Sequence, residues 1–297
     1  MTKQVTIGNN HNTRSLLKQY GLHAKKGYGQ NFLTDVNILH QIVVAARISP
    51  NDNVIEIGPG LGALTQQLAA SAGEVLGIEI DADLMPVLHE LFRQSTNVHL
   101  LQGDVMKLDL AATIADQFDD PTRPVKVVAN LPYYITTPIL MKLLKCRAAW
   151  STICVMMQKE VAERIVARPD TKEYGSLTLA VQSQMDAEIA FAVSKKYFLP
   201  SPKVDSAIVV LTPRKQPIDP QPLDFDKLTM VIRGCFAHRR KNLRNNLRGL
   251  VGKDQSKLEQ AADLLSPLGI SLQQRPAELS LSQYAALTNK LITAHLI

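Results

Sequence analysis

Short apolar runs alternate with helical patterns through the first two thirds of the chain. Five runs have the length of a buried strand, and they cover residues 54–57, 75–80, 98–101, 125–129 and 153–157. Helical spacing of apolar residues appears over 35–47, 61–72, 83–93, 138–145 and 159–167. This alternation predicts an α/β fold with a mainly parallel, doubly wound sheet. Two later runs, 189–193 and 207–211, predict a hairpin added to that sheet.

A proline-rich segment interrupts this pattern. Pro213, Pro217, Pro220 and Pro222 lie close together, which favours a linker. Beyond them the apolar spacing is helical over 226–237, 239–249, 255–265 and 282–294. We therefore expect a polar N-terminal extension over 1–24 that is mobile at its start, an α/β domain over 25–212, a linker over 213–225 and a smaller all-helical domain over 226–297.

Composition narrows the class of protein. The 297 residues are 45% hydrophobic and carry a net charge of +6, which favours an anionic partner such as nucleic acid. The three cysteines are not at metal-ligand or redox spacing, so we expect no disulfide framework and no metal site. No apolar run approaches the length of a membrane span, and the polar start does not resemble a signal peptide. These features together favour a cytoplasmic protein without membrane contact.

The tetrapeptide Asn130-Leu131-Pro132-Tyr133 follows the run at 125–129 and carries candidate chemistry. The side-chain oxygen of Asn130 and the carbonyl of Leu131 can both accept hydrogen bonds from an aromatic amine, which frees the nitrogen lone pair for attack. Pro132 stiffens the turn, and the ring of Tyr133 can stack on a base, an interaction worth roughly 1–3 kcal/mol. An ordinary strand-to-loop turn would also explain these residue types.

A glycine-rich turn with Gly58 and Gly60 follows the first strand, where backbone amides at a helix start can approach a ligand closely. Glu79 ends the next strand, where a carboxylate can bind ribose hydroxyls, and Asp104 follows the third, where it can accept from an adenine amine. Because parallel strands end at one edge of a sheet, we expect these residues and Asn130 on one rim. S-adenosylmethionine suits this set better than NAD, because it has no pyrophosphate. Ordinary helix-capping carboxylates are the alternative.

Four motifs in order give the chain a resemblance to a known family. They are GQNFL at 29–33, EIGPGLG at 56–62, NLPYYI at 130–135 and FLPSPKVDS at 198–206. In these motifs the chain resembles the ribosomal RNA adenine dimethyltransferases, most closely those that act on the bacterial small subunit. Tyr134 departs from some relatives, which have Asn there. The resemblance implies a Rossmann-like class I methyltransferase fold, S-adenosylmethionine as cofactor and N6-dimethylation of two adjacent adenosines during ribosome biogenesis.

The resemblance also implies roles for individual residues. Asn31, Leu33 and Gly58 would lie at the methionine end of the cofactor, Glu79 would hold its ribose and Asp104 its adenine. Asn130 would activate the target amine, while Tyr133 and Phe198 would sandwich the target base. Without the resemblance, Phe198 would be expected simply to pack in the core.

A basic run without acidic residues covers 233–248. Arg240, Arg244 and Arg248 recur every four residues, so they would share one helix face, with leucines on another. Such a face is often merely solvated, but we expect contacts to ribosomal RNA phosphates. The candidate RNA-binding residues are Arg239, Arg240, Lys241, Arg244 and Arg248, to which Lys25 and Lys26 could add.

The predicted partner is the small ribosomal subunit with its RNA, bound by a monomer. Three alternatives stay open: a large-subunit dimethylase of the antibiotic-resistance type, a DNA adenine methylase, and a non-catalytic RNA-binding assembly factor.

Overall fold

The computed structural model describes residues 7–146, 150–252 and 254–297. The chain divides into two compact units, one made of Met1–Ala162 with Glu188–Pro213 and the other of Glu163–Ala187 with Arg214–Ile297. Each unit has its own hydrophobic core. In the described residues, no helix is long and apolar enough to cross a membrane.

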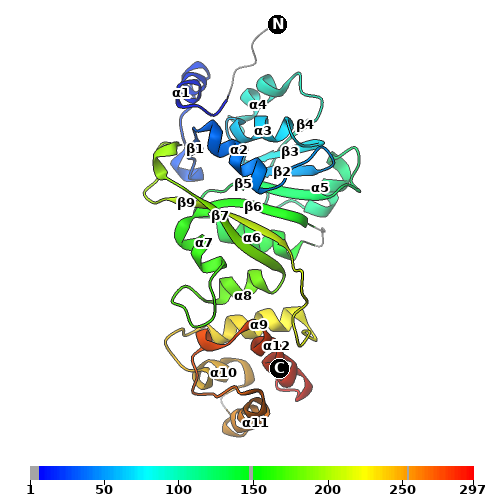
Figure 1. Ribbon diagram of the computed structural model, residues 1–297, viewed down its shortest axis with the longest axis vertical. Coiled ribbons are helices and arrows are strands. Elements are labelled where there is room, and N and C mark those ends of the chain that lie inside the picture. Colours follow the sequence, from blue (N-terminus) through cyan, green and yellow to red (C-terminus); the bar gives the residue numbers. More distant parts are fainter. Residues whose placement is uncertain (1–6, 147–149, 253) are drawn as a thin grey trace. The chain divides into compact units, whose positions relative to one another are not determined.

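The first unit is built on a seven-stranded sheet in the order β4-β3-β2-β5-β6-β9-β7 (Figure 1). The strands are β2 Asn53–Ile57, β3 Glu74–Glu79, β4 Val98–Gln102, β5 Val125–Asn130, β6 Trp150–Gln158, β7 Met185–Val193 and β9 Ser206–Pro213. The five strands that lie in the order β4-β3-β2-β5-β6 run parallel to one another, and β9 pairs antiparallel with β6. This confirms the predicted mainly parallel, doubly wound sheet. The order reverses between β2 and β5, and ligands bind at such reversal points in open α/β sheets.

Most helices of this unit lie where the apolar spacing predicts them. The unit contains α2 Val36–Ala45, α3 Ala63–Ala69, α4 Met85–Phe92, α5 Leu110–Gln117, α6 Thr136–Lys145 and the first half of α7 Lys159–Ile165, which continues into the second unit after Ala162. Asp35 caps α2 by accepting from the amide of Ile38. Helix α5, like α8 of the second unit, is not among the helices predicted from the apolar spacing. A separate two-stranded sheet joins β1 Phe32–Leu33 to β8 Phe198–Leu199.

The polar N-terminal segment contains a helix, α1 Asn10–Gln19, which the apolar spacing does not predict. Asn9 caps this helix by accepting from the amide of Asn12. Ile7 and Leu16 are buried in a cluster that includes Phe92 of α4. Leu17, Tyr20 and Leu22 pack against neighbouring clusters as well, so several apolar side chains hold a segment whose average composition is polar. Residues 1–6 lie outside the described part of the chain.

The second unit is helical, with α8 Ser176–Gln182, α9 Phe225–Cys235, α10 Leu243–Val251, α11 Gln255–Leu265 and α12 Leu281–Thr293. It includes residues 163–187, which chain order alone would assign to the α/β part. The physical reason is burial, because Tyr174 and Leu179 belong to the core of the C-terminal helices. The Tyr174 hydroxyl also donates to the carbonyl of Leu279 at 2.9 Å.

Candidate active site

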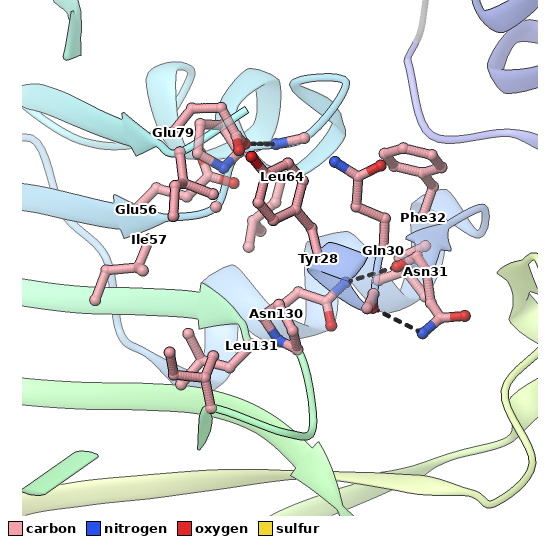
Figure 2. A pocket seen from close by; sticks show the side chains of 18 of the residues that line it. Tyr28, Gln30, Asn31, Phe32, Glu56, Ile57, Leu64, Glu79, Asn130 and Leu131 are labelled. Carbon is pink, nitrogen blue, oxygen red and sulfur yellow. Dashed lines mark hydrogen bonds between the residues drawn. The ribbon is translucent and has the colours of Figure 1, made fainter. Parts of the chain in front are cut away.

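A cleft opens at the carboxyl ends of the parallel strands, within the first unit (Figure 2). Its walls include every residue that the sequence singled out for chemistry or cofactor binding. Those residues are Asn31, Leu33, Gly58, Gly60, Glu79, Asp104, Asn130, Leu131, Pro132, Tyr133 and Phe198. Segments that are far apart along the chain therefore meet at one place, although the roles of these residues stay predictions.

The glycine-rich turn after β2 forms the floor of the cleft. Gly58 and Gly60 have φ of +74° and +61°, values that side-chain-bearing residues rarely adopt. A Cβ on Gly58 would meet nothing within 4 Å, so open space lies directly beside this backbone. The amide of Gly60 donates to Glu79 Oε2 at 2.9 Å, which ties the turn to the end of β3.

Two carboxylates at the ends of β3 and β4 face the cleft in different environments. Glu79 is almost fully buried and accepts backbone amides from Gly60 and Asp81, both at 2.9 Å. Burial raises the pKa of Glu79, while these hydrogen bonds oppose that shift. Asp104 is more exposed and uses one oxygen to accept the amide of Met106 at 2.9 Å. Both carboxylates are held by backbone bonds, and each oxygen keeps acceptor capacity for a ligand.

Glu56 is a third carboxyl group of the cleft, to which the sequence pattern assigns no separate role. It is the penultimate residue of β2, has only 2% exposure and accepts from the Thr65 hydroxyl at 2.5 Å. Burial raises its pKa from 4.5 to about 8. The signal that could have identified it is an acidic residue inside an otherwise apolar strand, immediately before the glycine-rich turn.

The amide of Asn130 has a defined orientation (Figure 2). Its Nδ2 donates to the backbone carbonyl of Asn31 at 3.2 Å, and only the nitrogen end of an amide can make that bond. Asn130 lines the cleft, and in the part of the chain that the structure describes its Oδ1 receives no hydrogen bond. The next residue, Leu131, lies just beyond the end of β5, where the strand ladder has stopped. Two acceptors therefore follow one another at the end of this strand.

Two aromatic side chains flank these acceptors. The Tyr133 hydroxyl is 2.8 Å from Ser206 Oγ, which fixes the far end of the ring, and burial raises its pKa. Phe198 lines the cleft from the β1–β8 sheet and at the same time packs in the core with Leu33. Phe198 therefore packs in the core, as its residue type suggests, and also lies at the cleft.

The charge of the cleft is one-sided. Its described lining contains the carboxyl groups of Glu79 and Asp104 and no Lys, Arg or His side chain, and Glu56, with a pKa of about 8, adds no charge near pH 7. Such a set favours a ligand with a positive charge and hydroxyl or amine donors, and disfavours a pyrophosphate.

The basic residues of the second unit do not all lie on the one helix face that the sequence pattern predicts. Helix α10 begins at Leu243, because Asn242 caps it by accepting from the amide of Asn245. Arg240 therefore lies in the turn before the helix and not in register with Arg244 and Arg248, so this part of the prediction is wrong. Arg239 donates to the carbonyls of Lys172 and Tyr174.

The described turn before α10 is nevertheless well organised. Asn246 is buried and accepts the amide of His238 at 2.8 Å, and its Nδ2 donates to the carbonyls of His238 and Asn242. Arg240, Lys241 and Arg248 are exposed around this scaffold. Among the described residues, no group of His, Cys, Asp or Glu could hold a metal ion.

Comparisons with known proteins agree with this geometry. The profile of the family "Ribosomal RNA adenine dimethylase" matches residues 21–289. The chain is 50% identical to the "Ribosomal RNA small subunit methyltransferase A" of Levilactobacillus brevis over 95% of both proteins. It is 48% identical to the protein of the same name from Lactiplantibacillus plantarum over the full length of both.

Two solved structures share the fold at 27% identity. A dimethyladenosine transferase from Plasmodium falciparum superposes with a TM-score of 0.74 over 89% of this chain and 98% of the other. The 23S rRNA methyltransferase ErmE superposes with a TM-score of 0.63 over 88% of this chain and all of the other.

Proposed function

This chain belongs to the ribosomal RNA adenine dimethylase family, and from that premise we propose that it methylates adenine N6 in small-subunit ribosomal RNA with S-adenosylmethionine. The product is N6,N6-dimethyladenine, formed by two successive transfers on each of two adjacent adenosines. Relatives at 48–50% identity that are named for the small subunit support this choice over the large subunit.

The chemistry of the cleft fits this cofactor. S-adenosylmethionine carries a ribose diol, an adenine and a positive sulfonium, and it lacks the phosphates that would need cationic partners. Glu79 would accept from the ribose hydroxyls and Asp104 from the adenine amine, while Asn31, Leu33 and Gly58 would border the methionine end. When bound, the cofactor supplies a methyl group that the sulfonium activates for transfer.

The observation that carries the proposal is the fixed amide of Asn130. Because its nitrogen is held by Asn31, its oxygen would be left to accept from a ligand in the cleft, and the amide cannot rotate without losing that bond. Together with the Leu131 carbonyl, it would accept both hydrogens of a target NH2. This draws the nitrogen towards tetrahedral geometry and makes its lone pair available, and the preset geometry lowers the cost of reaching the transition state.

The rest of the site would position the base. Tyr133 and Phe198 would stack on the two faces of the adenine, which must leave its helix or come from a single strand to be reached. The described lining contains no His or Cys as a general base. None is needed, because the methylated arylammonium is acidic and loses its proton readily. Arg240, Lys241, Arg244 and Arg248 would contact RNA phosphates.

The experiment is methyl transfer from labelled S-adenosylmethionine to small ribosomal subunits that lack dimethyladenine. Naked ribosomal RNA, large subunits and DNA are tested beside them. We expect label as dimethyladenine in the small subunits only. Label in large-subunit RNA or in DNA would replace the proposed substrate. Cofactor binding with no transfer to any substrate would favour an assembly factor without catalysis.

A further inference from the structure

Residues 25–31 form a strap along one wall of the cleft. The segment contains a short 3-10 helix over Lys26–Tyr28 and contributes the lining residues Tyr28, Gly29, Gln30 and Asn31 (Figure 2). The carbonyl of Asn31 also holds the amide of Asn130. The position of the strap therefore affects both the cofactor wall and the orientation of the amine acceptor.

One carboxylate outside the cleft holds this strap. Lys25 Nζ lies 2.6 Å from Asp81 Oδ1, and Gln30 Nε2 donates to Asp81 Oδ2 at 2.8 Å. The two strap residues are also joined to each other, because the Lys25 amide donates to Gln30 Oε1 at 2.9 Å. The Asp81 side chain is only 3% exposed. Lys25 is thus neutralised locally and is a poor candidate for an RNA phosphate.

The backbone of Asp81 also contacts Glu79, the residue proposed to bind the cofactor ribose. The amide of Asp81 donates to Glu79 Oε1 at 2.9 Å, although Asp81 itself does not line the cleft. Asp81 therefore has two contacts. Its side chain binds the strap, and its main-chain amide binds the Glu79 carboxylate at the end of β3. Because Asp81 supports both groups, a displacement of the strap would change the position of Glu79, and the reverse also holds.

We propose that Asp81 is a positioning residue that latches the strap against the cofactor cleft, so that strap closure and S-adenosylmethionine binding favour each other. This inference rests on the proposed function, because it takes that cofactor as the ligand. When Glu79 is engaged, Asp81 stays in place and its two oxygens hold Lys25 and Gln30. When the latch is broken, the wall formed by Tyr28 to Asn31 is no longer fixed and the cleft is open on that side.

The test compares two aspartates that share one lysine. Lys25 Nζ lies 2.6 Å from both Asp81 and Asp83, but Asp83 is 62% exposed and does not bond Gln30. In Asp81→Asn the side chain keeps its shape, loses its charge and turns an NH2 towards the strap donors. We expect the dissociation constant for S-adenosylmethionine to rise about tenfold or more, the order expected when a charge-assisted bond is lost. Asp83→Asn should change it less than about twofold, as for an exposed pair.

Hydrogen exchange of the amides over 25–31 gives a readout independent of methyl transfer. Cofactor should slow exchange of these amides in the wild type and in Asp83→Asn, and should fail to do so in Asp81→Asn. Lys25→Met and Gln30→Leu break the same bonds from the strap side and are expected to reproduce the loss of affinity with little change in melting temperature. These variants keep the test decisive if Asp81→Asn does not fold.

The outcomes separate the two proposals. Equal affinity and equal strap protection in the wild type and in the strap-side variants would refute the latch. So would an effect of Asp83→Asn as large as that of Asp81→Asn. If wild-type protein binds no S-adenosylmethionine, the proposed function fails and not the latch alone.

Discussion

Glu56 makes the stability of the sheet-bearing unit depend on pH. Its side chain is buried and accepts a hydrogen bond from the Thr65 hydroxyl, and its pKa in the folded protein is about 8 instead of 4.5. Between these values the folded chain holds a proton that the unfolded chain has released. The stability from the neutral carboxyl is therefore fully present below about pH 4.5 and is lost as pH rises through about 8.

The size of the effect follows from linkage. One proton corresponds to about 1.4 kcal/mol per pH unit, so between pH 5 and 8 the free energy of unfolding should fall by about 3–4 kcal/mol through Glu56 alone. Glu56→Gln keeps an acceptor for Thr65 and cannot ionise. We expect the variant to match the wild type near pH 5 and to exceed its stability by about 3–4 kcal/mol near pH 8.

The assay is urea unfolding followed by tryptophan fluorescence. Trp150 is the one tryptophan of the sequence and is buried in β6, so its signal reports on the sheet-bearing unit. Glu79 also has a raised pKa, and its charge is one of the causes of the raised pKa of Glu56, so the difference between the two curves reports the coupled pair. Glu90→Gln, an exposed position on α4, is the matched control and should give a curve parallel to the wild type. Parallel curves for Glu56→Gln and the wild type would refute the reasoning.

Three further predictions concern the site, the turn and the RNA surface. Asn130→Ala should lower single-turnover methyl transfer by about 100-fold or more, with cofactor binding retained in a calorimetric titration; transfer at the wild-type rate would remove its assigned role. Gly62→Ala should destabilise the first unit by about 2–4 kcal/mol in urea, because φ is +79° and the new Cβ would lie 2.6 Å from the ring of Phe92. Replacing Arg244 and Arg248 together by Ala should weaken RNA binding and reduce the slope of log affinity against log salt by about 1–2; an unchanged slope would argue against phosphate contacts.

Local periodicity predicts the strands of the seven-stranded sheet and most helices of the sheet-bearing unit, but not the short strands β1 and β8. A buried parallel strand reads as a continuous apolar run, and each run ends at the edge where ligands bind. This is why Gly58, Glu79, Asp104 and Asn130 could be placed on one rim before the structure was known, and they line one cleft. Not every helix leaves such a trace, and contacts between residues distant in sequence leave none. Helix α5 and the anchoring of α1 by Ile7 and Leu16 are examples.

The tertiary structure decided the properties that depend on distant partners. The amide of Asn130 is oriented by a carbonyl 99 residues away along the chain, and Arg239 is occupied by the backbone of residues 172 and 174. The raised pKa of Glu56 comes from burial, which no single segment produces. The sequence by itself determined which residue types stand at the strand ends, because strand length and apolar spacing are local. Hydrogen-bond partners, burial and charge state arose only when the segments packed together, because each is set by atoms that the chain brings from elsewhere.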